Sequence, residues 1–207
     1  MMRGRKRPEI NTIREAIAWT YANLARAHMA LEEGATKYDQ RHHIVRDRTY
    51  RGLVEGTIAM RSLIDDERMK MKLPQCCAYC GANGTLTIDH LLPRVGGGID
   101  AASNAVWACR SCNSSKGKKD VTAWLVARSR FPSVVVLRRY LKLVYQWCDG
   151  EGILDVAKDQ LKADNLPFSA DMLPLSFPPL PELCFTVEPV EHSNDAARSE
   201  MRKDVGS

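Results

Sequence analysis

The sequence predicts an α+β fold that is mainly helical, with a small strand–strand–helix core framed by cysteines. Two Cys-x-x-Cys pairs, separated by 28 residues, enclose short strand-like patterns and a glycine-rich loop. Amphipathic helical patterns lie on both sides of this stretch. Six of the ten prolines lie between Pro167 and Pro189, which precludes a long helix or a central strand there.

The helices before the cysteines are expected in two places. Thr12 and Glu15 have the spacing of a capping box, so the first helix is expected over Thr12–Glu33. A polar, basic connection follows. The second helix is expected over Tyr50–Lys72 and should end before Pro74, which disfavours helical backbone in the residue before it.

The helices after the cysteines are expected in three places. A short helix should begin near Asp120, and Pro132 and Ser133 should open a longer one with an apolar stripe. A weaker helical pattern runs over Ile153–Ala163. The proline-rich stretch that follows should be extended and either packed over the domain or loosely ordered.

Composition indicates an ordinary globular protein. The chain has 207 residues, with 44% hydrophobic and 27% charged residues, which suits one domain with a core and some appendages. The basic start is followed by no apolar run, so a signal peptide is not expected. No stretch approaches the roughly 18 apolar residues of a membrane span. These features favour a soluble, cytoplasmic protein without a membrane partner.

Charge and composition divide the chain into three expected segments. Residues 1–75 form a helical N-terminal segment with fifteen Lys/Arg against ten Asp/Glu. Residues 76–150 form the cysteine-framed core and its following helices, with ten against four. Residues 151–207 form a Pro-rich, acidic C-terminal extension, with five against eleven. The first two segments suggest a polyanionic partner, although charge alone leaves a solvated basic face equally open.

The cysteine spacing predicts a structural zinc site. Cys77, Cys80, Cys109 and Cys112 form the two pairs, and each Cys-x-x-Cys turn presents two thiolates to one metal. Four cysteine ligands close a tetrahedral site and leave no position for water or substrate. Cys76 could replace Cys77, but only Cys77 makes the two-residue spacing. The alternative is a set of unrelated buried thiols.

The segment between the pairs predicts strand, loop, strand and helix in that order. "LTIDH" resembles a short strand, "LLPRVGGGID" turns through three glycines, and "NAVWACRSC" returns to the second pair. These residues, over about 76–120, resemble the HNH endonuclease family with its ββα-metal (treble-clef-like) core. The resemblance identifies His90, Asn104 and Asn113 as the motif residues. Their spacings are fourteen and nine residues.

The resemblance implies a second, catalytic metal. Many HNH enzymes end the motif with His, whereas this chain has Asn113, a variant also found in the HNH domain of RNA-guided CRISPR effectors. An amide oxygen beside a carboxylate suits a hard ion such as Mg²⁺ or Mn²⁺. Asp89 and Asn113 are therefore the expected ligands. His90 is the expected general base, and Asn104 is expected to brace the loop and orient His90.

The expected substrate is DNA, held by cations around the motif. Arg94, Arg110, Lys116, Lys118 and Lys119 are expected to contact the phosphate backbone, which carries no sequence information by itself. The resemblance implies a metal-dependent endonuclease that nicks or cuts DNA. It makes a setting in phage biology, restriction or antiviral defence plausible, with a possible protein partner in a larger system.

Two alternatives remain open at the level of sequence. A non-catalytic zinc module that binds DNA or a protein partner would need the cysteines but not His90 or Asn113. The joint presence of Asp89, His90, Asn104 and Asn113 argues against it. An RNA-cleaving nuclease would use the same chemistry, although the sequence contains no recognisable RNA-binding module.

Overall fold

The computed structural model describes residues 7–60, 62–161 and 166–190, and it confirms the α+β fold class. The α-helices are α1 (Ile13–Glu32), α2 (Gln40–Val54), α3 (Leu63–Lys70), α4 (Arg110–Lys116), α5 (Val121–Val126) and α6 (Val134–Gly150). The strands are β1 (Leu86–His90) and β2 (Ala105–Cys109), which pair antiparallel. None of the helices in the described ranges has both the length and the hydropathy of a membrane span.

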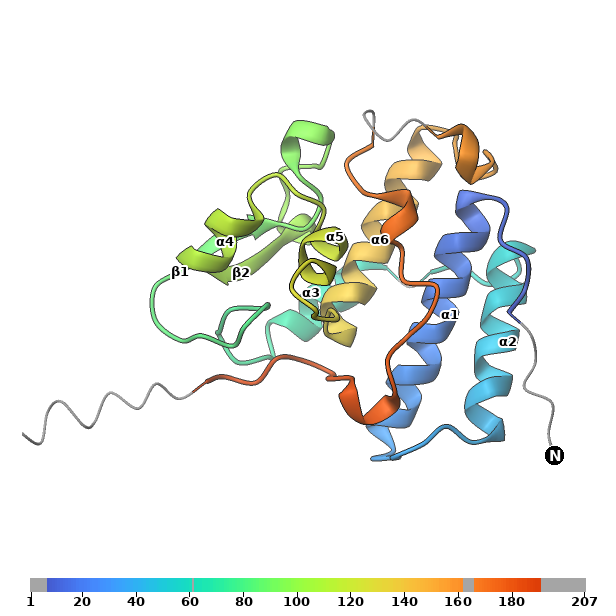
Figure 1. Cartoon of the computed structure of the whole chain (residues 1–207), viewed down its shortest axis with the longest axis horizontal. Coiled ribbons are helices and arrows are strands. Elements are labelled where there is room, and N and C mark those ends of the chain that lie inside the picture. Colours follow the sequence, from blue (N-terminus) through green and yellow to red (C-terminus); the bar gives the residue numbers. More distant parts are fainter. Residues whose placement is uncertain (1–6, 61, 162–165, 191–207) are drawn as a thin grey trace, which may run out of the picture.

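The molecule has a helical body and a small unit of two strands and one helix beside it. Helices α1, α2 and α6 make up the body, and β1, β2 and α4 make up the small unit, with α5 between them (Figure 1). The expected order of strand, loop, strand and helix is confirmed. One hydrophobic core joins the two parts, because side chains of α1, α6 and β2 belong to the same buried cluster and Leu86 of β1 packs against it.

Helix α6 lies at the centre of this core. Ser133 accepts a hydrogen bond from Val136 N and so caps the helix, as its position before the apolar stripe predicts. The stripe is buried through most of its length. Its fully buried residues are Leu137, Tyr140, Leu141 and Val144, and those of α1 include Ile13, Ala16 and Ile17. Burial of these apolar faces is the main stabilising contribution to the body.

The first helix begins as predicted, but the prediction for the second was wrong. The capping box of Thr12 and Glu15 is formed at the start of α1. The expected basic connection is instead α2, because Asp39 and His42 form a second reciprocal cap. Gly56, at φ +73°, lies in the turn that follows, and α3 is a separate short helix.

A helix over Ile153–Ala163 was also predicted wrongly. Only one 3₁₀ turn, Lys158–Gln160, forms in the described part of that range. The backbone of residues 154–158 instead forms hydrogen bonds with the start of α1 and the residues before it. Arg14 N donates to Leu154 O, and Lys158 N donates to Asn11 O. Residues 162–165 and 191–207 of the expected C-terminal extension lie outside the described residues.

Residues 166–190 form a segment, here called the C-terminal strap, that runs from the helical body to the small unit (Figure 1). Trp19 Nε1 donates to Leu175 O, and Val134 N donates to Cys184 O. At its end, Val190 N donates to Gly81 O in the turn of the first cysteine pair. The strap therefore connects α1, the start of α6 and the cysteine turn through backbone hydrogen bonds.

Candidate metal centre and active site

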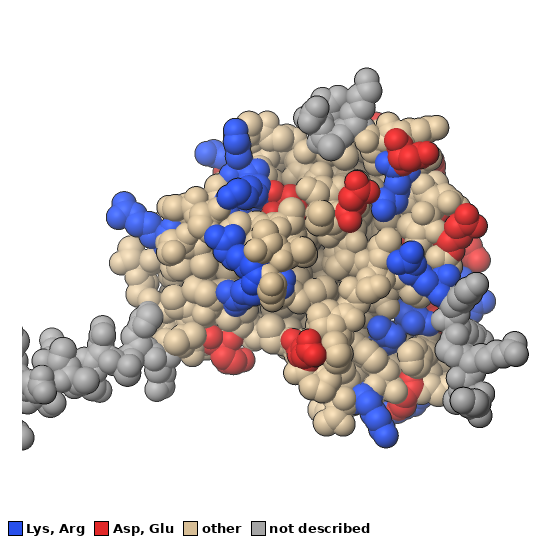
Figure 2. Space-filling view, in the orientation of Figure 1, with Lys and Arg blue, Asp and Glu red and all other residues tan. Residues whose placement is uncertain are grey.

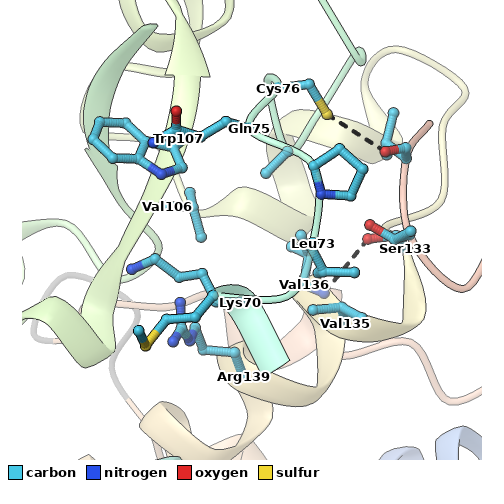
Figure 3. Close-up of a pocket in the computed structure, with 15 residues that line it drawn as sticks. Lys70, Leu73, Gln75, Cys76, Val106, Trp107, Ser133, Val135, Val136 and Arg139 are labelled. Atoms are coloured by element: carbon cyan, nitrogen blue, oxygen red, sulfur yellow. Dashed lines mark hydrogen bonds between the residues drawn. The ribbon is translucent and has the colours of Figure 1, made fainter. Parts of the chain in front are cut away.

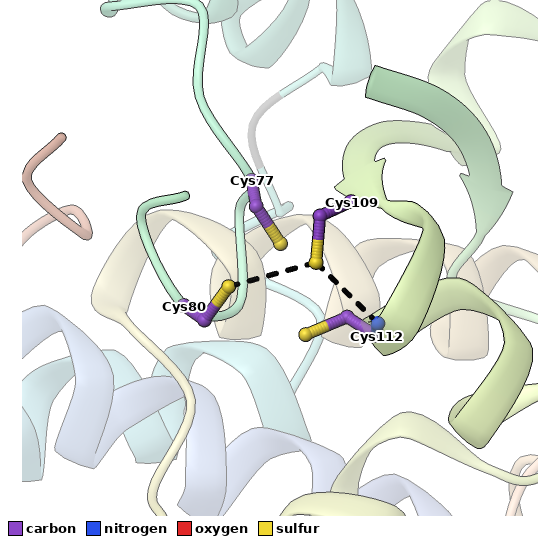
Figure 4. Close-up of side chains that lie close together, drawn as sticks. All are labelled: Cys77, Cys80, Cys109 and Cys112. Carbon is purple, nitrogen blue, oxygen red and sulfur yellow. Dashed lines mark hydrogen bonds between the residues drawn. The ribbon is translucent and has the colours of Figure 1, made fainter. Parts of the chain in front are cut away.

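The four predicted zinc ligands meet at one end of the β1–β2 hairpin. The sulfur atoms of Cys77, Cys80, Cys109 and Cys112 all lie within 4.8 Å of one another and point toward a common centre (Figure 4). Gly81 N donates to Cys77 O and closes the first turn. Cys109 Sγ accepts from Cys112 N at 3.4 Å at the start of α4, so the second pair is held by the helix cap.

The electrostatics of the cluster suit a cation. Burial raises the pKa of the Cys112 thiol, and the neighbouring Cys109 raises it further. Burial also acts to raise the pKa of Cys109, but hydrogen bonds from Cys112 outweigh it and lower that pKa. Thiolates this close need a positive charge between them, and four soft ligands at such distances are compatible with a structural Zn²⁺. Cys76 lies outside the cluster, with its Sγ donating to Val187 O.

At the other end of the hairpin, successive residues of β1 face opposite sides. Asp89 pairs with Val106 and His90 pairs with Ala105 in the antiparallel register. Because strand side chains alternate, Asp89 faces α4 and the interior, whereas His90 lies on the opposite, more open face. Asp89 and His90, although neighbours in the sequence, therefore point to different sides of β1.

The Asp89 carboxylate is buried and has two partners. Lys116 Nζ donates to Asp89 Oδ1 at 3.1 Å, and the Tyr79 hydroxyl donates to Asp89 Oδ2 at 2.5 Å. Lys116 Nζ also donates to the backbone oxygen of His90 at 2.7 Å. Burial and the nearby carboxylate together raise the pKa of Tyr79 well above its usual value, so its proton stays in place to hold Asp89.

Lys116 therefore differs from the sequence-based expectation. Its side chain was expected to contact phosphate, but it is 1% exposed and its charge is neutralised by Asp89. Lys116 lies three residues after Asn113, so both residues share the face of α4 that packs against β1. A lysine on that face reaches the strand rather than the solvent.

Asn113 is fixed at the edge of β1. Its Nδ2 donates to Thr87 Oγ1 at 2.9 Å and to Ile88 O at 3.0 Å. Both amide hydrogens are used in this way. The amide oxygen receives no hydrogen bond from the described residues, so it remains available as a neutral oxygen ligand.

The His90 imidazole contacts a carboxylate that sequence reasoning did not single out. His90 Nε2 and Asp100 Oδ1 lie 3.0 Å apart, and Arg94 donates to Asp100 Oδ2 at 2.8 Å. The hydrogen bond with His90, and then that with Arg94, lower the pKa of Asp100. Arg94, expected to bind phosphate, also anchors Asp100 while remaining exposed.

Asn104 closes the loop between the strands from inside. The side chain is fully buried, and its Oδ1 accepts from Leu92 N at 2.8 Å. Its Nδ2 donates to Leu92 O and Ile99 O, both at 2.9 Å. These bonds join the two ends of the loop over residues 92–99. No hydrogen bond joins the Asn104 side chain to His90 in the described chain, and Asp100 is the side chain that contacts the imidazole.

The other expected phosphate contacts are exposed. Arg110, Lys118 and Lys119 all lie on the surface around α4. Figure 2 shows Lys and Arg side chains gathered over the part of the molecule that carries α4 and α5. The exposed cations Arg110, Lys118 and Lys119 therefore lie at or next to the helix that carries Asn113.

A separate cavity of about 560 Å³ lies between β2, the start of α6 and the strap (Figure 3). Val106 and Trp107 line one side and Val135 and Val136 another. Lys70 and Arg139 both donate hydrogen bonds to Ala105 O, so these N–H groups bond to the protein itself. None of the expected catalytic residues lines this cavity.

Comparison with known proteins agrees with this geometry. The family model for the HNH endonuclease matches residues 77–119. Residues 77–119 form an HNH domain. No curated protein and no solved structure matches the chain significantly. An HNH domain implies a nucleic-acid substrate and a nuclease in general.

Two residues of the HNH domain escaped the sequence reasoning. Tyr79 lies inside the first cysteine pair and contacts Asp89 from there. Asp100 lies ten residues after His90, at the end of the glycine-rich loop. A carboxylate just after three glycines, where the loop must fold back on itself, is the signal that could have indicated Asp100.

Proposed function

We propose that this HNH protein is a metal-dependent endonuclease that hydrolyses DNA phosphodiester bonds. The observation that supports the proposal is the match of residues 77–119 to the HNH endonuclease family, with Asp89 and His90 adjacent on β1 and Asn113 bonded to that strand. Asn113 binds the backbone oxygen of Ile88, two residues before His90, and Asp100 contacts the His90 imidazole. We infer that the candidate base His90, the Asp89 carboxylate and the Asn113 amide oxygen act at the end of β1.

His90 acts as the general base in this proposal. When Nε2–H donates to Asp100, the lone pair on Nδ1 is free to take a proton from water. The negative charge of Asp100 also stabilises the imidazolium that results. Arg94 keeps Asp100 in place, because it occupies the second carboxylate oxygen.

Asp89 and Asn113 hold the divalent ion in this proposal. One carboxylate and one amide oxygen suit Mg²⁺ or Mn²⁺, and such an ion, when bound, would polarise the scissile phosphate and stabilise the leaving oxygen. Asp89 would exchange its contact with Lys116 for the ion. Lys116 would then be released to neutralise other negative charge near the strand end.

Two other functions fit parts of the molecule less well. A zinc module that only binds DNA or a protein partner would not need the contact between His90 and Asp100. A ribonuclease would use the same residues on a different substrate. The strongly basic surface around α4 favours a duplex, whose phosphates lie close together on both strands.

The test is cleavage of supercoiled plasmid with Mg²⁺ or Mn²⁺, comparing the wild type with His90→Ala. The wild type should convert plasmid to open-circle or linear DNA, and the variant should lose about 100-fold or more of that rate with unchanged zinc content. A structured RNA is incubated in parallel. Preferential RNA cleavage would support the ribonuclease, and DNA binding without cleavage by the wild type would support the zinc module.

The family resemblance also suggests a setting in restriction, phage defence or phage biology, with a protein partner in a larger system. Cells that express the wild type should then restrict plating of at least one phage relative to cells that express His90→Ala. Equal plating across a phage panel would argue against a role in defence.

A further inference from the structure

The side of α4 that faces away from β1 carries a second group of polar contacts. Ser115 Oγ accepts from Arg128 Nη2 at 2.6 Å and from Trp124 Nε1 at 3.0 Å. The backbone oxygen of Ser115 accepts from Lys119 Nζ at 2.9 Å. Ser115 therefore gathers two cations, Lys119 and Arg128, at one point beside α4.

These two charges have no acidic counterpart. Lys119 and Arg128 are both exposed, and no carboxylate of the described residues bonds to either. The nearest acidic residue along the chain, Asp120, is buried and turned inward. Its oxygens accept from Thr122 Oγ1, Ala123 N and Tyr140 OH. Like charges held together without a counter-ion are unfavourable, and an anion between them removes that cost.

The Arg128 guanidinium is also held in place before any ligand binds. It lies over the Trp124 ring at 4.6 Å from the centroid, and that ring is only 2% exposed. The stacking and the bond to Ser115 use one face and one edge of the guanidinium. Arg128 is exposed and only its Nη2 is bonded to Ser115, so its other N–H groups remain available in the planar fork that recognises phosphate.

The position of this group relative to the active site follows from helix geometry. Successive residues of an α-helix are about 100° apart around the axis. Asn113 and Ser115 therefore lie on opposite flanks of α4, with Ser114 between them. Ser114 and Arg110 are exposed, so the ridge between the two flanks is open to solvent. A polymer lying over this ridge can reach both flanks.

We propose that Lys119 and Arg128 bind a second phosphate of the DNA substrate, across α4 from the scissile phosphate. This proposal rests on the proposed function, because it assigns one further contact to the same substrate. A helix with its side chains is about 10 Å across, and one strand of B-form DNA has a phosphate about every 3.4 Å along the axis. The second phosphate lies within about three nucleotides of the cut, on the same or the opposite strand.

The test measures binding separately from cleavage. A short fluorescent duplex is titrated at several salt concentrations with zinc-loaded His90→Ala protein, and with the same protein carrying Arg128→Gln or Lys119→Gln. Because both residues contact the same phosphate, either substitution should lower the slope of log K against log salt by up to about 0.9, the value for one neutralised phosphate. Arg48→Gln, an exposed arginine on α2, is the matched control and should leave the slope unchanged. Equal slopes in all four proteins would overturn the proposal.

The Arg128→Lys variant distinguishes loss of the phosphate contact from loss of folding. This variant keeps the charge and should retain most of the slope. If Arg128→Lys lost as much slope as Arg128→Gln while both proteins kept the wild-type melting temperature, the charge at residue 128 would not account for the slope, and the proposed phosphate contact of Arg128 would be overturned. If both lost binding together with their fold, Lys119→Gln, whose side chain is exposed, would decide the question alone.

Duplexes with single neutral methylphosphonate linkages locate the contact. One linkage near the cut should weaken binding by His90→Ala protein, and the Arg128→Gln protein should be insensitive to that same linkage. Equal sensitivity of both proteins at every position would overturn the proposal. If the wild type cleaves no plasmid but Arg128→Gln and Lys119→Gln still lower the salt slope, the phosphate site would be supported and the nuclease activity rejected.

Discussion

The two ends of the β1–β2 hairpin are built by different means. At one end, where Leu86 pairs with Cys109, four cysteines from two short turns converge. At the other end, where His90 pairs with Ala105, the side chains are held by partners from several segments of the chain. Asp89 depends on Tyr79 and Lys116, and His90 contacts Asp100.

The difference shows what short-range spacing can and cannot specify. A Cys-x-x-Cys turn brings its two ligands together by itself, so the zinc end needs only two such turns to meet. The end that carries Asp89 and His90 contains a buried ion pair, and a buried charge is tolerated only when its partner is in place. Tyr79 connects the ends, because it lies within a cysteine turn and donates to Asp89.

Removal of the zinc site should have the largest effect. Cys112→Ser breaks the tetrahedral set, and structural zinc contributes on the order of 10 kcal/mol to folding in small domains. We expect loss of zinc binding and loss of amide protection over both strands, including Asp89, measured by hydrogen exchange. Cys76→Ser, outside the cluster, should keep full zinc content. Wild-type zinc content in Cys112→Ser would contradict the four-cysteine site.

Breaking the buried ion pair should have the next largest effect. Lys116→Met leaves the Asp89 carboxylate buried without its cation, which typically costs about 3–5 kcal/mol of unfolding free energy. Urea denaturation of the zinc-loaded protein measures it. Lys118→Met, at an exposed position two residues later, should change stability by less than about 0.5 kcal/mol. Similar losses in both variants would show that the pair does not stabilise the fold.

The same Lys116→Met protein sharpens the proposal for the catalytic ion. Without the competing ammonium, Asp89 should bind Mg²⁺ more tightly, so added Mg²⁺ should raise the melting temperature of the variant more than that of the wild type. An Asp89→Asn, Lys116→Met double variant should lose this response. A response equal to that of the wild type would argue against Asp89 as a ligand.

Loosening the loop should have an intermediate effect. Asn104→Ala removes three hydrogen bonds and leaves Leu92 N without a partner, which costs about 1–3 kcal/mol for a buried donor. Faster hydrogen exchange at residues 92–99 measures the local loss. Asn83→Ala, which removes one exposed bond to Val190, is the control. Unchanged exchange in Asn104→Ala would mean that the glycine-rich loop holds its shape without the asparagine.

The smallest effect on stability is expected at Asp100. Asp100→Asn keeps the size of the side chain and removes its charge, so the melting temperature should stay the same. The cleavage rate should fall roughly tenfold, because part of the contribution of a well-oriented base is lost. The exposed Asp171→Asn is the matched control and should cleave at the wild-type rate. A wild-type rate in Asp100→Asn would remove Asp100 from the mechanism.

The cysteine ligands and the strand order could be predicted because their signals are local. The spacing of Cys77 and Cys80 is sufficient by itself to predict that both bind one metal. The alternation of side chains along a strand predicts that Asp89 and His90 face opposite sides. The partner of Asp89 could not be predicted as readily, since it depends on how closely α4 packs on β1. The spacing of Asn113 and Lys116 along one helix face was visible in the sequence, but their shared face was overlooked.

The predicted helix boundaries were wrong where polar contacts between side chains, and not the hydropathy pattern, determine where a helix begins. The segment that forms α2 has few apolar residues, so its sequence predicts a connection between helices. Its start is fixed by Asp39 and His42, and buried His42 also contacts Glu33 at the end of α1. Polar contacts between consecutive helices leave no periodic pattern to detect.

The C-terminal strap affects the order in which parts of the protein can fold during synthesis. Val190 pairs with Gly81 inside the first cysteine turn, more than a hundred residues earlier in the chain. Contacts between such distant residues form late, since a large loop must close before they stabilise anything. During synthesis, the helical elements and the cysteine turns emerge well before the strap that joins them. A ribosome-bound chain would therefore carry the HNH motif before the contact of Val190 with the first cysteine turn can form.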